Sequence, residues 1–352
     1  MSLVIAQELF FNRMEKGSLM EADELVHFLK SERETDLTLF ETIDLNTWLE
    51  RLNTLFPLRE FIDDTLVNEI IVHGEDGIQI DKQGKLQTFP WHKMDVSLVQ
   101  MLELMALREN QAWNYQKPFG SFALKIRHHH FRATLLHSSL SPDQKTKLFL
   151  RRLKTGELSL DDFDLSIDEK NFLTEQLINK KNILFCGATG SGKTSLMSAM
   201  LKEVQDNEHV VLLEDTHEIC LNKDHFTYLL AEEDTEKKTL KDYCKYAMRL
   251  RPDRIIIGEL RGEEAVPFLL SMNNGHKGLM STIHAHSAIE APMRLAMLFS
   301  LYSKTVNMNL ELVLKLVCSN VDYIVHMKDK KINEVVQLLG CEGSTPYVEK
   351  IF

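Results

Sequence analysis

The sequence predicts two domains of different fold class: a C-terminal α/β domain with a mostly parallel sheet and a smaller N-terminal α+β domain. Between residues 169 and 352, short apolar runs alternate with helical patterns, which is typical of a doubly wound sheet. Residues 65–90 instead alternate apolar and polar side chains around turn signals, which indicates a small antiparallel sheet. A length of 352 residues also suits two domains.

The composition is that of a soluble globular protein, with 44% hydrophobic and 26% charged residues. No stretch approaches the ~20 apolar residues of a membrane-spanning helix, and the first residues do not resemble a signal peptide. The net charge of −11 argues against a general affinity for nucleic acid or anionic lipid. We therefore expect no specific nucleic acid as a partner.

The cysteines are scattered singly and form no CxxC pair, so no zinc site is expected. They are Cys186, Cys220, Cys244, Cys318 and Cys341. Their simplest interpretation is reduced thiols in a cytoplasmic protein.

Residues 1–155 are assigned to the N-terminal domain, and residues 1–50 of it have the pattern of amphipathic helices. A helix is expected near Val96–Asn110, and strands near Asn68–Gly74, Phe122–Ile126 and Phe131–Leu136. The internal run His128-His129-His130 is interpreted as partly exposed strand residues, with metal binding as the alternative.

Residues 156–168 are polar and acidic, and we interpret them as a solvated connection that can act as a hinge. Residues 169–352 then form the α/β domain. It should begin with a helix near Glu169–Asn179, followed by strands at Ile183–Cys186, Val210–Leu213, Ile255–Ile257 and Leu279–Ile283.

A phosphate-binding loop follows the first of these strands. Its eight residues fit GxxxxGK[ST] between a strand and a helix; they are Gly187, Ala188, Thr189, Gly190, Ser191, Gly192, Lys193 and Thr194, with Ser195 next in the helix. The glycines let backbone N–H groups surround a phosphate, Lys193 supplies a charge for the β- and γ-phosphates, and the Thr194 hydroxyl can bind Mg²⁺. The motif therefore predicts ATP and Mg²⁺ as ligands.

Acidic residues follow two other strands. Val210–Leu213 is followed by Glu214, Asp215 and Glu218, and Arg254–Gly258 by Glu259. ATP hydrolysis needs a carboxylate near Mg²⁺ and a group that activates water. We expect both at the carboxyl ends of strands beside the loop strand. An acidic turn in water is the alternative for the first group.

Histidines follow a fourth strand. His284 and His286 come directly after Leu279–Ile283, and His276 precedes it. Such a histidine could donate a hydrogen bond to the γ-phosphate or to a neighbouring carboxylate. Packing or surface exposure is the competing interpretation.

These segments, in this order, resemble the secretion traffic ATPases, which power type II and type IV secretion and type IV pili. The similarity covers the C-terminal half and, more weakly, residues 55–155. Walker A is Gly187–Thr194, the aspartate box Leu213–Ile219, the Walker B region Leu250–Gly262, and the histidine box Gly275–Ala285. The family usually has threonine where Asn274 stands.

The resemblance implies a RecA-like ATPase domain, nucleotide binding between two domains, and a homo-hexamer that works with an inner-membrane platform or channel protein. It implies that Glu214 is the general base, that Glu259 acts at Mg²⁺ directly or through water, and that His284 contacts the γ-phosphate. Arginines of the N-terminal domain contact phosphates in this family, and the candidates are Arg132, Arg151 and Arg152. The protein would be cytoplasmic and peripherally associated with the inner membrane.

The short length and the lack of a cysteine-rich metal subdomain set aside the large type II secretion form. The residues Glu214-Asp215-Thr216 and the eight-residue spacing from His276 to His284 most resemble the compact branch, which contains type IV secretion and tight-adherence pilus ATPases. The expected function is thus a hexameric ATPase motor of a type II or type IV secretion system or pilus. The alternatives are a nucleic-acid-dependent RecA-like motor, against which the acidic charge argues, and an ATP-binding scaffold with low turnover.

Overall fold

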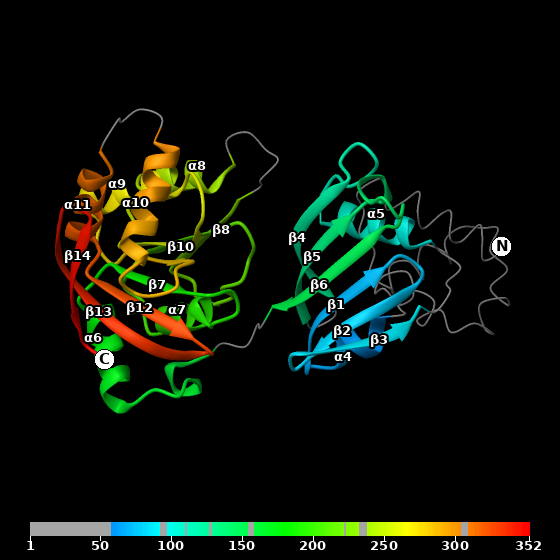
Figure 1. Ribbon diagram of the computed structural model, residues 1–352, viewed down its shortest axis with the longest axis horizontal. Helices are drawn as coiled ribbons and strands as arrows, with labels where there is room; N and C mark the ends of the chain where they lie inside the picture. The colour runs from blue at the N-terminus through cyan, green and yellow to red at the C-terminus, as the bar shows by residue number, and fades with distance from the viewer. Residues whose placement is uncertain are drawn as a thin grey trace. The chain divides into compact units, whose positions relative to one another are not determined.

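The computed structural model describes residues 58–91, 97–109, 111–126, 129–153, 158–221, 223–231, 238–303 and 309–352. The chain divides into two compact units, with the boundary after residue 154 (Figure 1). Among the described residues, the first unit has one hydrophobic core and the second has two. The predicted helical extension, residues 1–50, lies outside the described residues. Among the described helices, none is both long and apolar enough to cross a membrane.

The first unit contains a six-stranded antiparallel sheet in the order β3-β2-β1-β6-β5-β4. Its strands are β1 (Val67–His73), β2 (Gly77–Lys82), β3 (Lys85–Pro90), β4 (Phe119–Ile126), β5 (His129–Leu136) and β6 (Lys147–Leu153). Side chains alternate between the faces of a strand, so that Phe131, Ala133 and Leu135 of β5 enter the core. Helices α4 (Arg59–Asp63) and α5 (Leu98–Arg108) contribute to the same core, and Ser97 caps α5.

The second unit contains an eight-stranded sheet in the order β14-β13-β12-β7-β11-β10-β8-β9. Its strands are β7 (Ile183–Gly187), β8 (Val210–Glu214), β9 (Phe226–Leu230), β10 (Arg254–Leu260), β11 (Met280–Ile283), β12 (Tyr323–Lys328), β13 (Lys331–Glu342) and β14 (Thr345–Lys350). All neighbours from β12 to β9 are parallel, and only β13 and β14 add antiparallel pairs at one edge. The predicted mostly parallel α/β sheet is therefore confirmed.

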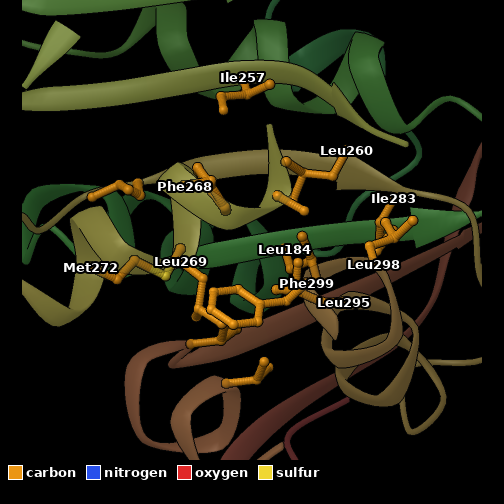
Figure 2. Packing of buried hydrophobic residues seen from close by; sticks show 14 of the residues in the cluster. Leu184, Ile257, Leu260, Phe268, Leu269, Met272, Ile283, Leu295, Leu298 and Phe299 are labelled. Carbon is orange, nitrogen blue, oxygen red and sulfur yellow. The ribbon is translucent and has the colours of Figure 1, made fainter. Parts of the chain in front are cut away.

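Helices cover both faces of this sheet, which explains why its strands are continuous apolar runs. Leu184 and Cys186 of β7 face one core, and Ile183 and Phe185 face the other. The first core is covered by α8 (Leu240–Ala247), α9 (Ala265–Asn273), α10 (Ala291–Tyr302) and α11 (Leu310–Asn320), and the second by α6 (Ile167–Ile178) and α7 (Lys193–Lys202). Figure 2 shows Phe299 of α10 packed near Leu184 in the first core.

The described part of the predicted connection, residues 158–168, packs against the second unit. Leu160, in the short helix η4 (Leu160–Asp162), is 3% exposed and packs in the core under α6 and α7. Leu158, Phe163 and Leu165 pack against the same core. These apolar residues, spaced among acidic ones, attach residues 158–168 to the second unit. Residues 156 and 157 lie outside the described residues.

Candidate active site

The phosphate-binding loop runs from the end of β7 to the start of α7 and needs glycine at both ends. A Cβ at Gly187, whose φ is +144°, would lie 2.2 Å from the carbonyl oxygen of Met327 in β12. Gly192 precedes α7 with φ +98°, a left-handed conformation that L side chains rarely adopt. Between them, Ala188, Thr189 and Gly190 are exposed. The loop is therefore packed at its base and open at its rim.

Lys193 is 6% exposed, and its ammonium group lies within its own loop. Its Nζ donates hydrogen bonds to the carbonyl oxygens of Gly187 at 3.0 Å and Ala188 at 2.8 Å. Burial lowers the pKa of Lys193, because desolvation disfavours the charged form. The Lys193 ammonium group is thus held beside the exposed residues of the loop, at the helix N-terminus where a phosphate group would bind.

The turn between β12 and β13 supports the loop, a role that the sequence did not reveal. The backbone N–H of Lys330 donates to the carbonyl oxygen of Ser191 at 3.1 Å. Asp329 and Lys330 have φ of +50° and +64°, as in a type I′ hairpin turn. Lys331 forms an ion pair with Asp164 at 2.6 Å. The hairpin therefore links the phosphate-binding loop to the segment before α6.

The order β7-β11-β10-β8 corrects one expectation about the acidic residues. The strands next to β7 are β12 and β11, and β11 precedes the histidines. The strands of Glu259 and Glu214 lie second and third from β7 on the β11 side. The four strands are parallel and in register, with Ile283 opposite Cys186, and Ile257 opposite Leu213. The predicted loop, histidine and carboxylates therefore share one edge of the sheet.

Glu259 and His284 contact each other at this edge. Nε2 of His284 lies 2.7 Å from Oε1 of Glu259. The backbone beneath them is tied together, because the hydroxyl of Thr282 donates to the carbonyl oxygen of Gly258 and that of Ser281 to Ile257, both at 2.8 Å. Of the two interpretations of His284, a partner for a neighbouring carboxylate fits this geometry.

Glu214 is 4% exposed, so it is not part of an acidic turn in water. Its Oε1 accepts the backbone N–H groups of Glu218 at 3.1 Å and Ile219 at 3.0 Å, and Nδ1 of His217 lies 3.3 Å from Oε2. Hydrogen bonding with Cys220 and with Glu214 raises the pKa of His217 to about 10. Backbone donors and a cation thus compensate a buried carboxylate.

The neighbouring Asp215 has a different partner. It forms an ion pair with Arg261, which follows β10. Glu264, which is 5% exposed, fixes that turn by accepting the backbone N–H groups of Arg261 at 2.6 Å and Gly262 at 2.7 Å. The sequence did not single out His217, Arg261 or Glu264. All three fall in or next to the quoted motifs, but only the fold shows which carboxylate each one meets.

The donor set suits Mg²⁺. The Thr194 hydroxyl and the Glu259 carboxylate are oxygen donors, which this cation prefers, and nucleotide sites hold it with one or two such groups plus phosphates and water. The part of the chain that the structure describes contains no cluster of three or more His, Cys, Asp or Glu residues able to hold a metal ion. Of the internal histidine run, His129 and His130 lie in β5 and His128 is outside the described residues.

The candidate arginines of the first unit separate onto two faces. Arg132 of β5 is directly opposite Arg151 of β6, and Glu69 of β1 is opposite Arg151. Arg132 donates from Nε to the hydroxyl of Ser121 at 3.3 Å. Two like charges directly opposite each other are unfavourable, so an anion between these two guanidinium groups would be stabilising.

Arg152, the third candidate, makes its contacts within the first unit. Its guanidinium donates to the carbonyl oxygens of Val67 and Ile62 at 2.7 Å each and of Asp64 at 3.0 Å. It also lies 4.8 Å from the centre of the Phe131 ring. These contacts join α4 and β1 to β5 and β6, and they occupy Nε and Nη2 of the guanidinium group.

Comparisons with known proteins agree over most of the chain. Residues 54–349 match the family model described as "Type II/IV secretion system protein". A putative conjugal transfer protein of Mycobacterium tuberculosis is 31% identical over 254 residues, covering 66% of this chain and 69% of that protein. The conjugal transfer protein TrbB of Rhizobium radiobacter is 28% identical over 290 residues, covering 79% and 86%.

Solved structures share the fold. The Legionella pneumophila ATPase DotB has a TM-score of 0.60 at 16% identity, covering 86% of this chain and 79% of that chain. The pilus retraction motor PilT with bound ADP has a TM-score of 0.58 at 18% identity, covering 84% and 82%.

Proposed function

This chain belongs to the type II/IV secretion system protein family, and we propose that it is an ATP hydrolase that works as a hexameric motor of a type II or type IV secretion system or of a type IV or tight-adherence pilus. The observation that carries the proposal is the shared sheet edge, where the phosphate-binding loop, Glu214, Glu259 and His284 come together. Relatives named for type IV secretion and conjugal transfer support the choice of machine.

Each side chain has a part in hydrolysis that its surroundings support. The loop N–H groups and Lys193 bind the β- and γ-phosphates, and Lys193 exchanges its carbonyl partners for phosphate oxygens. Glu214 accepts a proton from the attacking water. Glu259, oriented by His284, would hold Mg²⁺ directly or through water, together with Thr194. Mg²⁺, when bound, neutralises charge on the phosphates.

Parts of the proposal concern the assembly. We propose a homo-hexamer on the cytoplasmic side of the inner membrane, attached through a platform or channel protein. Arg132 and Arg151 are proposed phosphate contacts because two positive charges directly opposite each other would be stabilised by an anion.

The test is phosphate release from Mg²⁺-ATP by the wild type, Lys193→Ala and Glu214→Gln. We expect turnover only in the wild type, with ATP binding lost in Lys193→Ala and kept in Glu214→Gln. Turnover that appears only when DNA is added would favour a nucleic-acid motor. Tight ATP binding without turnover in the wild type would favour a scaffold.

A further inference from the structure

The Glu214 carboxylate is held by three donors from the loop that follows it. Two backbone N–H groups, of Glu218 and Ile219, bond to Oε1, and Nδ1 of His217 lies 3.3 Å from Oε2. Each carboxylate oxygen offers two lone-pair positions. Oε1 is therefore fully used, whereas Oε2 keeps one position for a further partner.

The direction of that remaining lone pair depends on the last torsion of the side chain. Gly258 of β10 packs against Glu214, since a Cβ there would lie 3.2 Å from Cγ of Glu214. This contact fixes the stem of the side chain but not its carboxylate plane, because χ3 of glutamate has a broad, roughly two-fold preference. The hydrogen bonds to both oxygens are what select one orientation.

His217 is itself oriented from outside the loop. Its ring meets the ring of Tyr228 in β9 edge-on, with centroids 5.9 Å apart and planes at 84°. The hydroxyl of Tyr228 donates to the carbonyl oxygen of Leu221, which closes the same loop. The imidazole is thus supported by a neighbouring strand, and Nδ1 donates to Oε2, since a carboxylate only accepts.

We propose that His217 is a positioning residue for ATP hydrolysis, which turns Glu214 so that the free lone pair of Oε2 receives the proton of the attacking water. This inference rests on the proposed function, because it takes Glu214 as the general base. In the step, Oε2 takes a proton from water while the water oxygen bonds to the γ-phosphorus. The bond from that phosphorus to the bridging oxygen breaks, and its electron pair leaves with ADP.

The experiment compares the wild type with His217→Ala, His217→Asn, Glu214→Gln and the control His225→Asn. Asparagine keeps a donor near the place of Nδ1. His225 lies in the same unit, and its Nδ1 is 3.7 Å from Oδ1 of Asp206. Steady-state kcat, the KM for Mg²⁺-ATP and the melting temperature are measured for each. We expect His217→Ala to lower kcat about tenfold at unchanged KM, His217→Asn to restore most of it, and His225→Asn to match the wild type.

Two results would overturn the inference while leaving the proposed function intact. In the first, Glu214→Gln has no turnover but His217→Ala keeps the wild-type kcat. In the second, His217→Ala and His217→Asn lose kcat and melting temperature in parallel, as a merely structural residue would. Full turnover in Glu214→Gln would instead reject Glu214 as the base, and the inference with it.

Discussion

Nε2 of His284 lies 2.7 Å from Oε1 of Glu259, so the histidine after β11 contacts the carboxylate near the end of β10. The contact follows from the strand order, in which β10 and β11 are parallel neighbours. Removing either side chain leaves the other without this partner. Their contributions to hydrolysis should therefore depend on each other.

The first prediction is non-additivity between these two residues. Glu259→Gln and His284→Asn should each lower kcat at least about tenfold. The kcat of the double variant should be only slightly below that of the less active single variant, because residues in contact have coupled effects. A double-mutant cycle on kcat measures this coupling. Effects that simply multiply would mean that the contact has no part in the reaction.

The second prediction is that replacing Lys193 removes ATP binding but increases the stability of the fold. Burial lowers the pKa of this lysine, so the fold is penalised for carrying the charged form, and stability rises as the pH approaches the ordinary value of 10.5. Lys193→Met should abolish ATP binding yet raise the melting temperature at pH 7.5 by a few degrees. This shift corresponds to roughly 1 kcal/mol of unfolding free energy. The gain should shrink toward pH 10. A melting temperature that falls at pH 7.5 would show that the bonds to Gly187 and Ala188 outweigh desolvation.

The third prediction concerns His326 of β12, which is 6% exposed. Burial lowers its pKa against the opposing effect of Glu334, whose Oε1 accepts the backbone N–H of Ala288 at 2.9 Å. The folded pKa is below the ordinary value of 6.5, so this histidine contributes stability above pH 6.5 that is lost as the pH falls. Between pH 7.5 and 5.5 the melting temperature should fall more steeply in the wild type than in His326→Asn. Parallel curves would contradict a buried neutral imidazole.

The fourth prediction separates two adjacent arginines. Arg152→Ala leaves the carbonyl groups of α4 and β1 without their donor, which should cost about 2–4 kcal/mol of unfolding free energy in urea. Arg151→Ala, on the other face of β6, should cost less than about 0.5 kcal/mol and instead weaken ATP binding or turnover. Equal losses of stability would show that Arg152 is no more structural than its neighbour.

Sequence reasoning was most successful where local signals and function coincide. The strands at Ile183–Cys186, Val210–Leu213, Ile255–Ile257 and Leu279–Ile283 are apolar runs. Three of them agree with the observed bounds within one residue, whereas β10 continues three residues beyond the predicted end, to Leu260. Beyond His286 no strand was predicted. In β12 the apolar run is interrupted by His326, a polar residue that is buried only because of its pairing with β7 and its contacts with β13.

The arrangement of the site depends on contacts that are distant in the sequence. Glu214, Glu259 and His284 could be predicted as site residues from their positions at the ends of strands. The contact between Glu259 and His284 could not be predicted without the strand order. Likewise, a one-residue step in β6 turns Arg151 and Arg152 to opposite faces of the sheet. Because residues 156–168 are acidic, the burial of Leu160 could not be predicted from the sequence. Leu160 is buried because it packs in the same core as α6 and α7.

The most direct test of the account is steady-state phosphate release from Mg²⁺-ATP, with the molar mass measured by light scattering on the same samples of wild type and Glu214→Gln. The account predicts that the wild type hydrolyses ATP with the mass of six chains, and that Glu214→Gln keeps that mass and binds ATP without hydrolysing it. A wild type that binds ATP as a monomer and releases no phosphate, even at high protein concentration, would contradict the account.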